Sequence, residues 1–221
     1  DAVQPAGILP VDASMADMIS LSGHKFYGPK GVGVLYIRSG ARVGKIITGG
    51  HQERSMRGGT TNVPGIVGLA EAFRLANEEM AQNNAHVSAI RDRFIARVLH
   101  EIPYVKLNGH PQDRLPNNAN FSFRYIEGES LLFSLDLSGI AVSSGSACSS
   151  GSLEPSHVLL ATGLPEGLAH GSVRFSFGKE NTAEQIDFAV DKLKEIVVRL
   201  RNLSPLFPKE LKNEVYDKEI Q

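Results

Sequence analysis

Residues 17–37 read DMISLSGHKFYGPKGVGVLYI, and this stretch decides the expected fold of the first part of the chain. Its two ends, residues 17–22 and 32–37, are short apolar runs of the kind that form buried strands. Between them, residues 23–31 contain three glycines and one proline, which favour a tight connection. The sequence therefore predicts two short buried strands joined by a turn that carries Lys25.

A lysine in a glycine-lined turn has two interpretations. It is either an ordinary solvated side chain or an amine that forms a Schiff base with an aldehyde. A dry turn disfavours the charged ammonium and leaves a neutral, nucleophilic amine, and Ser22 and His24 would then be placed to hydrogen-bond an anion. A P-loop is excluded, because the turn lacks the G-x-x-x-x-G-K-[ST] spacing and neither Ser nor Thr follows Lys30.

The first four residues, Asp1-Ala-Val-Gln4, fit the Schiff-base interpretation. A pyridoxal cofactor needs a carboxylate facing its pyridinium nitrogen, which keeps that nitrogen protonated. It also benefits from a donor near its phenolic oxygen. Asp1 and Gln4 supply these two groups if they lie at the end of a strand.

The rest of the sequence predicts a second glycine-rich segment, a long helical region and then an α+β unit. The glycine-rich segment is 49–65, and apolar residues from 66 onward recur at helical spacing to about residue 100. Further strands are expected at 104–107, 119–125, 139–143 and 173–177, and further helices near 128–138 and 155–162. A last helix is expected to begin after Thr182, which forms a capping box with Gln185, and to run to about residue 201.

Composition excludes several classes of protein. The chain has 221 residues, and its formal net charge of −1 gives no electrostatic reason to expect nucleic acid or an anionic membrane as a partner. The single cysteine, Cys148, cannot form an intramolecular disulfide, and a structural zinc site would need further thiolates. A run of about 18 apolar residues is absent, so no membrane-spanning helix is expected. We expect a globular, cytoplasmic protein.

Cys148 lies in the segment SSGSACSSGS, residues 143–152. A lone cysteine is often a small buried hydrophobe, but these small polar neighbours cannot build a core around it. A glycine- and serine-rich loop suits a reactive thiol that has to move between a substrate and an acceptor. Arg174 lies between two apolar residues at the start of an alternating strand, where a surface arginine is the default interpretation.

Five collinear segments together resemble the cysteine desulfurases, a pyridoxal-phosphate-dependent group within the class V aminotransferase-like proteins. They are DAVQ (1–4), SGHKFYGPKGVGVLY (22–36), GGHQERSMRGGTTNVPG (49–65), VSSGSACSSGSLEPSHVL (142–159) and SVRFSFG (172–178). The resemblance spans about residues 1–190 and is strongest to the group with the long SSGSAC loop, in its C-terminal portion.

The resemblance implies an α/β fold of the class V aminotransferase-like type, with a partial large domain and a complete small α+β domain. Residues 1–76 would be the C-terminal part of the large cofactor-binding domain, and residues 77–203 the small domain that carries the cysteine loop. Residues 204–221, punctuated by proline and mixed in charge, would be an exposed tail. The remaining half of the site would come from an upstream segment or from a separate chain.

The resemblance also implies the cofactor site. Lys25 would bind pyridoxal phosphate as a Schiff base and later move the Cα proton of the substrate. Asp1 would face the pyridine nitrogen and Gln4 the phenolic oxygen. Ser22 and His24 would hold the phosphate.

Two further positions complete the site that the resemblance implies. Thr60 would reach the phosphate of the other subunit's cofactor, which implies a homodimer. Arg174 would bind the α-carboxylate of the substrate.

The activity implied is removal of sulfur from L-cysteine, which leaves L-alanine and a persulfide on Cys148. An acceptor such as an iron–sulfur scaffold protein would take the sulfur, with Cys148 as a transient cluster ligand and no resident metal. Two alternatives remain open. One is a related pyridoxal-phosphate lyase or aminotransferase without persulfide chemistry, and the other is a non-catalytic fragment that only binds partners.

Overall fold

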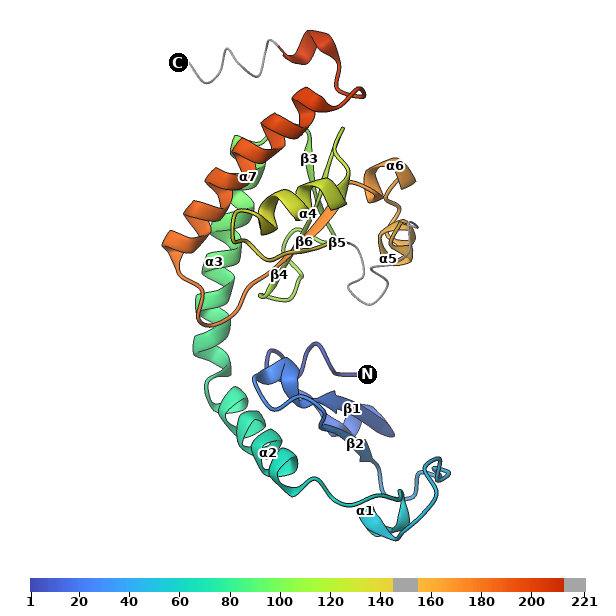
Figure 1. Ribbon diagram of the computed structural model, residues 1–221. Helices are drawn as coiled ribbons and strands as arrows, with labels where there is room; N and C mark the ends of the chain where they lie inside the picture. The colour runs from blue at the N-terminus through green and yellow to red at the C-terminus, as the bar shows by residue number, and fades with distance from the viewer. Residues whose placement is uncertain (145–154, 213–221) are drawn as a thin grey trace. The chain divides into compact units, whose positions relative to one another are not determined.

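The structure is a computed structural model that describes residues 1–144 and 155–212 (Figure 1). The chain divides into two compact units, Asp1–Asn84 and Ala85–Gln221, each of which is described by itself. The division falls inside helix α3 (Met80–Glu101), whereas the sequence suggested a boundary at residue 76. A helix that runs through the boundary offers no change of composition to mark it.

Two antiparallel strands form the sheet of the first unit. Strand β1 (Met18–Ser22) pairs with β2 (Gly33–Ile37), in a register that sets Ser22 opposite Gly33. Both strands were predicted, but β2 differs in burial, since even its central residue Leu35 is 55% exposed. A strand with apolar residues on both faces is typical of a sheet covered on both sides, and no layer of this unit covers β2.

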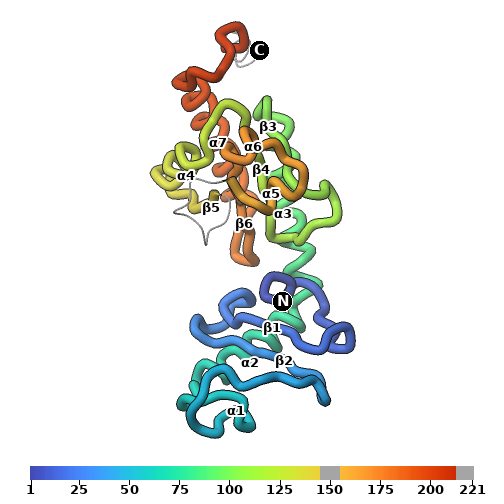
Figure 2. The backbone as a smooth tube through the Cα atoms, turned by 90° about the vertical axis from the view of Figure 1, so that its right-hand side faces the viewer, coloured from blue at the N-terminus to red at the C-terminus, as the bar shows by residue number. Residues whose placement is uncertain are grey.

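The turn after β1 packs against a helix. The short 3₁₀ helix η2 (Gly23–Phe26) contacts α2 (Val63–Glu78), and Phe26 shares a buried cluster with Leu69. Asn62 caps α2 by accepting a hydrogen bond from the backbone N–H of Gly65. The other short elements of this unit are η1 (Ala13–Met15) and α1 (Gln52–Ser55), and Figure 2 shows the path of the chain around them.

The long helix predicted from residue 66 to about 100 is two helices. Helix α2 ends at Glu78, and α3 begins at Met80. Residues 69–102 contain neither glycine nor proline, so the sequence carries no local signal for the break at Glu79.

The second unit is built on a four-stranded antiparallel sheet in the order β3-β4-β6-β5. The strands are β3 (Val105–Asn108), β4 (Asn118–Phe123), β5 (Ser143–Ser144) and β6 (Ser172–Ser176). Three of them were predicted close to these bounds. The strand expected at 139–143 contributes only Ser143 and Ser144 to the sheet.

Alternation along the strands decides which face of this sheet is buried under helices. Ala119, Phe121 and Phe123 of β4 are fully buried and lie in one core with residues of α3, α4 (Gly128–Asp136) and α7 (Ala183–Leu203). Figures 1 and 2 show α3 and α7 on one side of the sheet and the short helices α5 and α6 on the other. These two helices are α5 (His157–Ala161) and α6 (Glu166–Ala169), of which α6 was not predicted.

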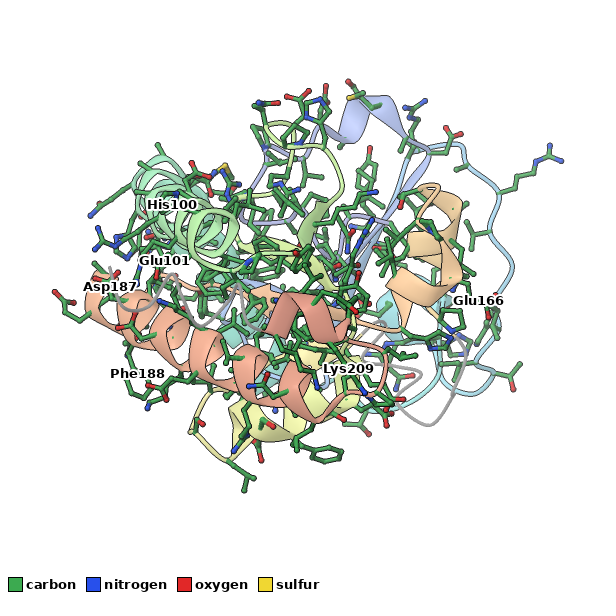
Figure 3. The ribbon with its side chains drawn as sticks, turned by 90° about the horizontal axis from the view of Figure 1, so that it is seen from above. His100, Glu101, Glu166, Asp187, Phe188 and Lys209 are labelled. Atoms are coloured by element: carbon green, nitrogen blue, oxygen red, sulfur yellow. The ribbon has the colours of Figure 1, made fainter. Side chains whose placement is uncertain are left out.

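An ion-pair cluster joins α3 to α7 at the surface of this core. Arg97 bonds to Glu101 of its own helix and to Asp187 and Asp191 of α7, at 2.6–3.1 Å. Figure 3 labels Glu101 and Asp187 on the two helices. Hydrogen bonds from Arg93 and then Arg97 hold the pKa of the Asp187 carboxyl below its usual value. The cluster adds polar contacts to the apolar packing of the two helices.

Helix α7 begins as predicted. The Thr182 side chain accepts from the backbone N–H of Gln185, and the Gln185 side chain accepts from that of Thr182. The capping box is therefore confirmed. Among the described residues, no helix is long and apolar enough to cross a membrane.

The segment after α7 is anchored at Phe207, although the sequence suggested an exposed tail from residue 204. Phe207 is 4% exposed, and its ring lies 5.4 Å from that of Tyr125 and 6.3 Å from that of Tyr104. The guanidinium of Arg201 lies 6.0 Å from the Phe207 ring and donates to the backbone oxygens of Tyr104 and Arg124. Burial lowers the pKa of Arg201 to about 10. An aromatic side chain thus fixes the start of the tail.

Replacing Phe207 with alanine should lower the free energy of unfolding by about 3 kcal/mol, because it removes a buried ring and leaves a cavity beside two tyrosines. Leu206→Ala is the matched control, since Leu206 is 73% exposed and should change stability by less than about 0.5 kcal/mol. Urea unfolding measures both variants. Equal destabilisation by the two would contradict the anchoring role of Phe207.

Candidate cofactor and substrate site

Lys25 lies on a turn that backbone hydrogen bonds close. The N–H of Gly23 donates to the oxygen of Val32 at 3.0 Å, and the N–H of Gly28 donates to the oxygen of Gly23 at 2.9 Å. Gly23 and Phe26 are buried, whereas His24 and Lys25 are exposed. The buried residues and the backbone hydrogen bonds therefore fix the turn, and its lysine is exposed. The dry surroundings expected for this amine are not supplied by the first unit.

Ser22 and His24 lie together at the start of this turn. The Ser22 hydroxyl and His24 Nδ1 are 2.9 Å apart, which is a hydrogen-bond distance. Ser22 is the last residue of β1, so the strand sets the position of its hydroxyl. A hydroxyl and an imidazole next to a lysine suit an anionic group such as a phosphate.

The N-terminal segment runs beside β1. The N–H of Ala2 donates to the oxygen of Ser20 at 3.0 Å, two residues before Ser22. Asp1 Oδ1 accepts from the N–H of Val3 at 2.7 Å, and Gln4 is exposed. The structure therefore places the segment that carries Asp1 beside the strand that ends at the lysine turn.

Space around the lysine turn is restricted at Gly28. A Cβ atom added there would lie 2.8 Å from the backbone oxygen of Gly23 and 3.2 Å from the Cβ of Ala72 on α2. Backbone cannot yield as a flexible side chain can. Only glycine allows the turn to close against the helix at this position.

Gly28→Ala should therefore lower the free energy of unfolding by about 1–3 kcal/mol and weaken cofactor binding, because the turn has to open. The control is Gly44→Ala, since no atom lies within 4 Å of a Cβ added at Gly44. Thermal unfolding and the absorbance of bound cofactor measure the two effects. A Gly28→Ala protein that matches the control in both would contradict this role.

Thr60 follows an unusual stretch of backbone. Glu53, Arg54 and Ser55 have φ of 46°, 57° and 69°, so three successive residues other than glycine are left-handed. Arg57 closes this stretch by donating to the oxygens of Gly58 at 3.3 Å and Gly59 at 2.9 Å. Thr60 itself is exposed, two residues before the N-cap of α2. The motif was noted in the sequence, but its left-handed turn has no sequence signal, because glycine is absent from it.

Arg174 lies on β6 in the second unit and is half-buried. Its Nη2 donates to the Ser143 hydroxyl at 3.3 Å. Its Nε is buried and has no hydrogen-bond partner in the described residues. An ordinary surface arginine keeps its guanidinium in water, so this burial disfavours the surface interpretation.

Arg174 is part of a polar row that crosses the whole sheet. Neighbouring strands place Asn108 opposite Asn120, Asn120 opposite Arg174, and Arg174 opposite Ser143. Asn108 Nδ2 donates to Asn120 Oδ1 at 2.6 Å. Sequence reasoning did not assign a role to Asn108, Asn120 or Ser143. The polar residues that alternate with Phe121 and Phe123 in β4 were the available signal.

The predicted site residues thus fall into two groups. Ser22, His24 and Lys25 adjoin one another in the first unit, beside the segment that holds Asp1 and Gln4 and in the same unit as Thr60. Arg174 belongs to the second unit, and Cys148 lies outside the described residues. In the ranges 1–144 and 155–212, no group of three or more His, Cys, Asp or Glu residues could hold a metal ion.

A lysine presented on a closed turn, beside a hydroxyl and an imidazole that suit an anion, defines a site of the kind that holds a phosphorylated aldehyde cofactor. The chain belongs to the aminotransferase class-V family, whose model matches residues 1–188. This family depends on pyridoxal phosphate. The class and cofactor that the sequence implied are therefore confirmed.

Curated relatives give a finer comparison. The chain is 53% identical over 212 residues to "Cysteine desulfurase IscS" of Methanosarcina thermophila. The aligned part covers 95% of this chain and 52% of the relative. It is 50% identical over 207 residues to "Cysteine desulfurase NifS" of Azotobacter vinelandii, and the aligned part covers 93% of this chain and 52% of the relative. The chain thus spans about half the length of the curated relatives it matches.

Solved structures show the same fold. A "NIFS-LIKE PROTEIN" matches with a TM-score of 0.81 and 38% identity, over 89% of this chain and 51% of the other. A NifS-like protein from Rickettsia africae matches with a TM-score of 0.80 and 30% identity, over 88% of this chain and 52% of the other. The class V aminotransferase-like α/β fold is confirmed.

The residues of the first unit fit the cofactor of this family. An exposed amine, a hydroxyl paired with an imidazole, and a carboxylate on the neighbouring segment are the groups that such a cofactor needs at its aldehyde, phosphate and ring nitrogen. The close approach of backbone at Gly28 keeps the turn that bears these groups in one conformation.

Proposed function

We propose that this chain is part of a cysteine desulfurase, an enzyme that takes sulfur from L-cysteine and leaves L-alanine and a persulfide on Cys148. The observation that carries the proposal is the closed turn that presents Lys25 beside the Ser22–His24 pair. Relatives that carry the name cysteine desulfurase share about half of the residues over most of this chain, which supports the substrate.

The proposed site assigns each cofactor contact to a residue of this chain. Lys25 holds the aldehyde carbon covalently, and Ser22 and His24 donate hydrogen bonds to the phosphate. Asp1 keeps the ring nitrogen protonated, and Gln4 donates to the phenolic oxygen. Thr60 reaches the phosphate in the other subunit of a homodimer. Pyridoxal phosphate, when bound, supplies a sink for the electrons released as the Cα proton leaves.

The remaining steps belong to side chains of the protein. Arg174 binds the substrate carboxylate, for which a guanidinium offers a bidentate fork. The Lys25 amine takes the Cα proton and later returns a proton. The Cys148 thiolate attacks the substrate sulfur and breaks its bond to carbon, and the electron pair of that bond stays on the carbon. Protonation then gives alanine, and the sulfur remains on Cys148 as a persulfide.

Product analysis tests the activity. Cofactor-loaded full-length protein is incubated with L-cysteine and a thiol reductant, and alanine and sulfide are quantified. Formation of both in equal amounts is the expected result. Pyruvate and ammonia in place of alanine would show a lyase, and consumption of an added keto acid would show an aminotransferase.

A mixing experiment tests the homodimer. The Lys25→Ala and Thr60→Ala proteins are each expected to have low activity alone, because both sites of each homodimer are damaged. A mixed dimer has one site with intact Lys25 from one subunit and intact Thr60 from the other, so activity should recover on mixing. Failure to recover, in subunits shown to exchange, would place Thr60 in its own subunit's site.

The sulfur acceptor and the location are also part of the proposal. We take an iron–sulfur scaffold protein as the acceptor, since the relatives bear the names IscS and NifS. We take the cytoplasm as the location, since a reducing compartment keeps the Cys148 thiol reduced and free to accept sulfur. Transfer of ³⁵S from L-cysteine to a purified scaffold tests the first. Cell fractionation tests the second.

A further inference from the structure

We propose that Ser143 is a positioning residue for Arg174: its hydroxyl holds the guanidinium in the orientation that receives a carboxylate, while the Asn108–Asn120 pair limits movement on the other side. This inference rests on the proposed function, since it assumes that Arg174 binds the substrate carboxylate. Ser143, Asn108 and Asn120 of the polar row thereby gain a role in substrate binding.

The guanidinium of Arg174 contacts the hydroxyl of Ser143. Strand β5 sets Ser143 directly opposite Arg174, and Nη2 donates to the hydroxyl at 3.3 Å. A guanidinium has five N–H groups, so a single hydroxyl orients the group without occupying it. Because an arginine side chain has many rotamers, such a contact lowers the entropy lost when a ligand binds.

The Asn108–Asn120 pair lies on the other side of Arg174. Asn120 lies directly opposite Arg174 on β4, and its amide oxygen accepts from Asn108 Nδ2 at 2.6 Å. Asn108 Nδ2 also donates to the Ser122 hydroxyl at 2.8 Å, and Asn108 is only 6% exposed. Directly opposed residues in antiparallel strands lie about 5 Å apart, so this fixed amide limits where the guanidinium can move.

The Nε of Arg174 is buried and has no hydrogen-bond partner in the described part of the chain. A buried donor without a partner is costly, and such groups in native structures need an explanation. A guanidinium held ready for a carboxylate supplies one. A purely structural arginine would gain by turning all its donors to water or to backbone oxygens.

The test compares substitutions of equal shape in the cofactor-loaded full-length protein. Ser143→Thr keeps the hydroxyl, and Ser143→Val has the shape of threonine without it. Ser144→Ala is the control on the same strand, because alternation points its side chain to the opposite face. We expect Ser143→Val to raise KM for L-cysteine about five- to tenfold and to change kcat less than about twofold. Ser143→Thr and Ser144→Ala should stay within about twofold of the wild type.

A second readout separates positioning from general damage. L-Alanine and L-alaninamide are titrated as inhibitors, since only the first has a carboxylate. Ser143→Val should weaken L-alanine binding about five- to tenfold and leave L-alaninamide binding unchanged. Equal weakening of both, or no difference between Ser143→Thr and Ser143→Val, would overturn the proposal.

The two titrations also distinguish this proposal from the proposed function. They are followed through the absorbance of the bound cofactor and need no turnover. A wild-type protein that releases no sulfide, but whose Ser143→Val variant loses affinity for L-alanine alone, refutes the proposed activity and supports the role of Ser143. If the wild type releases sulfide but the titrations of wild type and Ser143→Val are identical, the proposed activity is supported and the role of Ser143 is refuted.

Discussion

Lys25→Ala is expected to remove the visible absorption of bound cofactor and to lower turnover of L-cysteine about a thousandfold or more. The amine is the group on the closed turn that can bond an aldehyde covalently, and the exposed position of Lys25 leaves it accessible. In the proposed mechanism the same amine also moves the Cα proton. Loss of a covalent anchor and of a proton carrier at once explains the size of the effect.

The measurement is an absorption spectrum with added pyridoxal phosphate, followed by the alanine assay. Lys30→Ala is the matched control, because Lys30 is an exposed lysine of the same connection between β1 and β2. The control should keep both the spectrum and the activity. If Lys25→Ala kept the absorption band while Lys30→Ala lost it, the lysine assignment would be wrong.

Cys148→Ala is expected to abolish sulfide and persulfide formation, again about a thousandfold or more, while cofactor binding is retained. The substrate would still reach the site, because Lys25 and Arg174 are unchanged, and the spectrum should still shift on addition of L-cysteine. What is lost is the thiolate that accepts the sulfur. Persulfide labelling and mass spectrometry of the protein after exposure to L-cysteine measure this directly.

Ser150→Ala, in the same serine-rich segment, is the control for Cys148→Ala and should carry a persulfide like the wild type. Unchanged sulfide release from the Cys148→Ala protein would remove the persulfide step from the proposed function. The related lyase would then be the better interpretation. The Lys25 prediction would stand in either case.

Local patterns in the sequence were sufficient for several elements of the fold, including the strands on either side of the lysine turn. The apolar runs around the lysine turn predicted β1 and β2, and the Thr182–Gln185 pair predicted the start of α7. Both depend on interactions within a few residues, which a sequence displays directly.

Features set by distant contacts were not predictable in the same way. The exposure of β2 depends on which layers surround it, and the contact of Arg174 with Ser143 depends on the register of two strands 31 residues apart. The burial of Phe207 depends on Tyr104 and Tyr125, which are distant in sequence. A sequence pattern gives the face of each strand, but it does not give the partner across the sheet.

The left-handed turn at Glu53, Arg54 and Ser55 restricts how this region can change over evolutionary time. Each residue there tolerates a backbone conformation that glycine adopts freely, that asparagine and aspartate adopt with little cost, and that β-branched residues adopt poorly. Sequence drift at these three positions should therefore be asymmetric, with valine, isoleucine and threonine excluded by the backbone itself. Selection on conformation would be separable from selection on chemistry at these three positions.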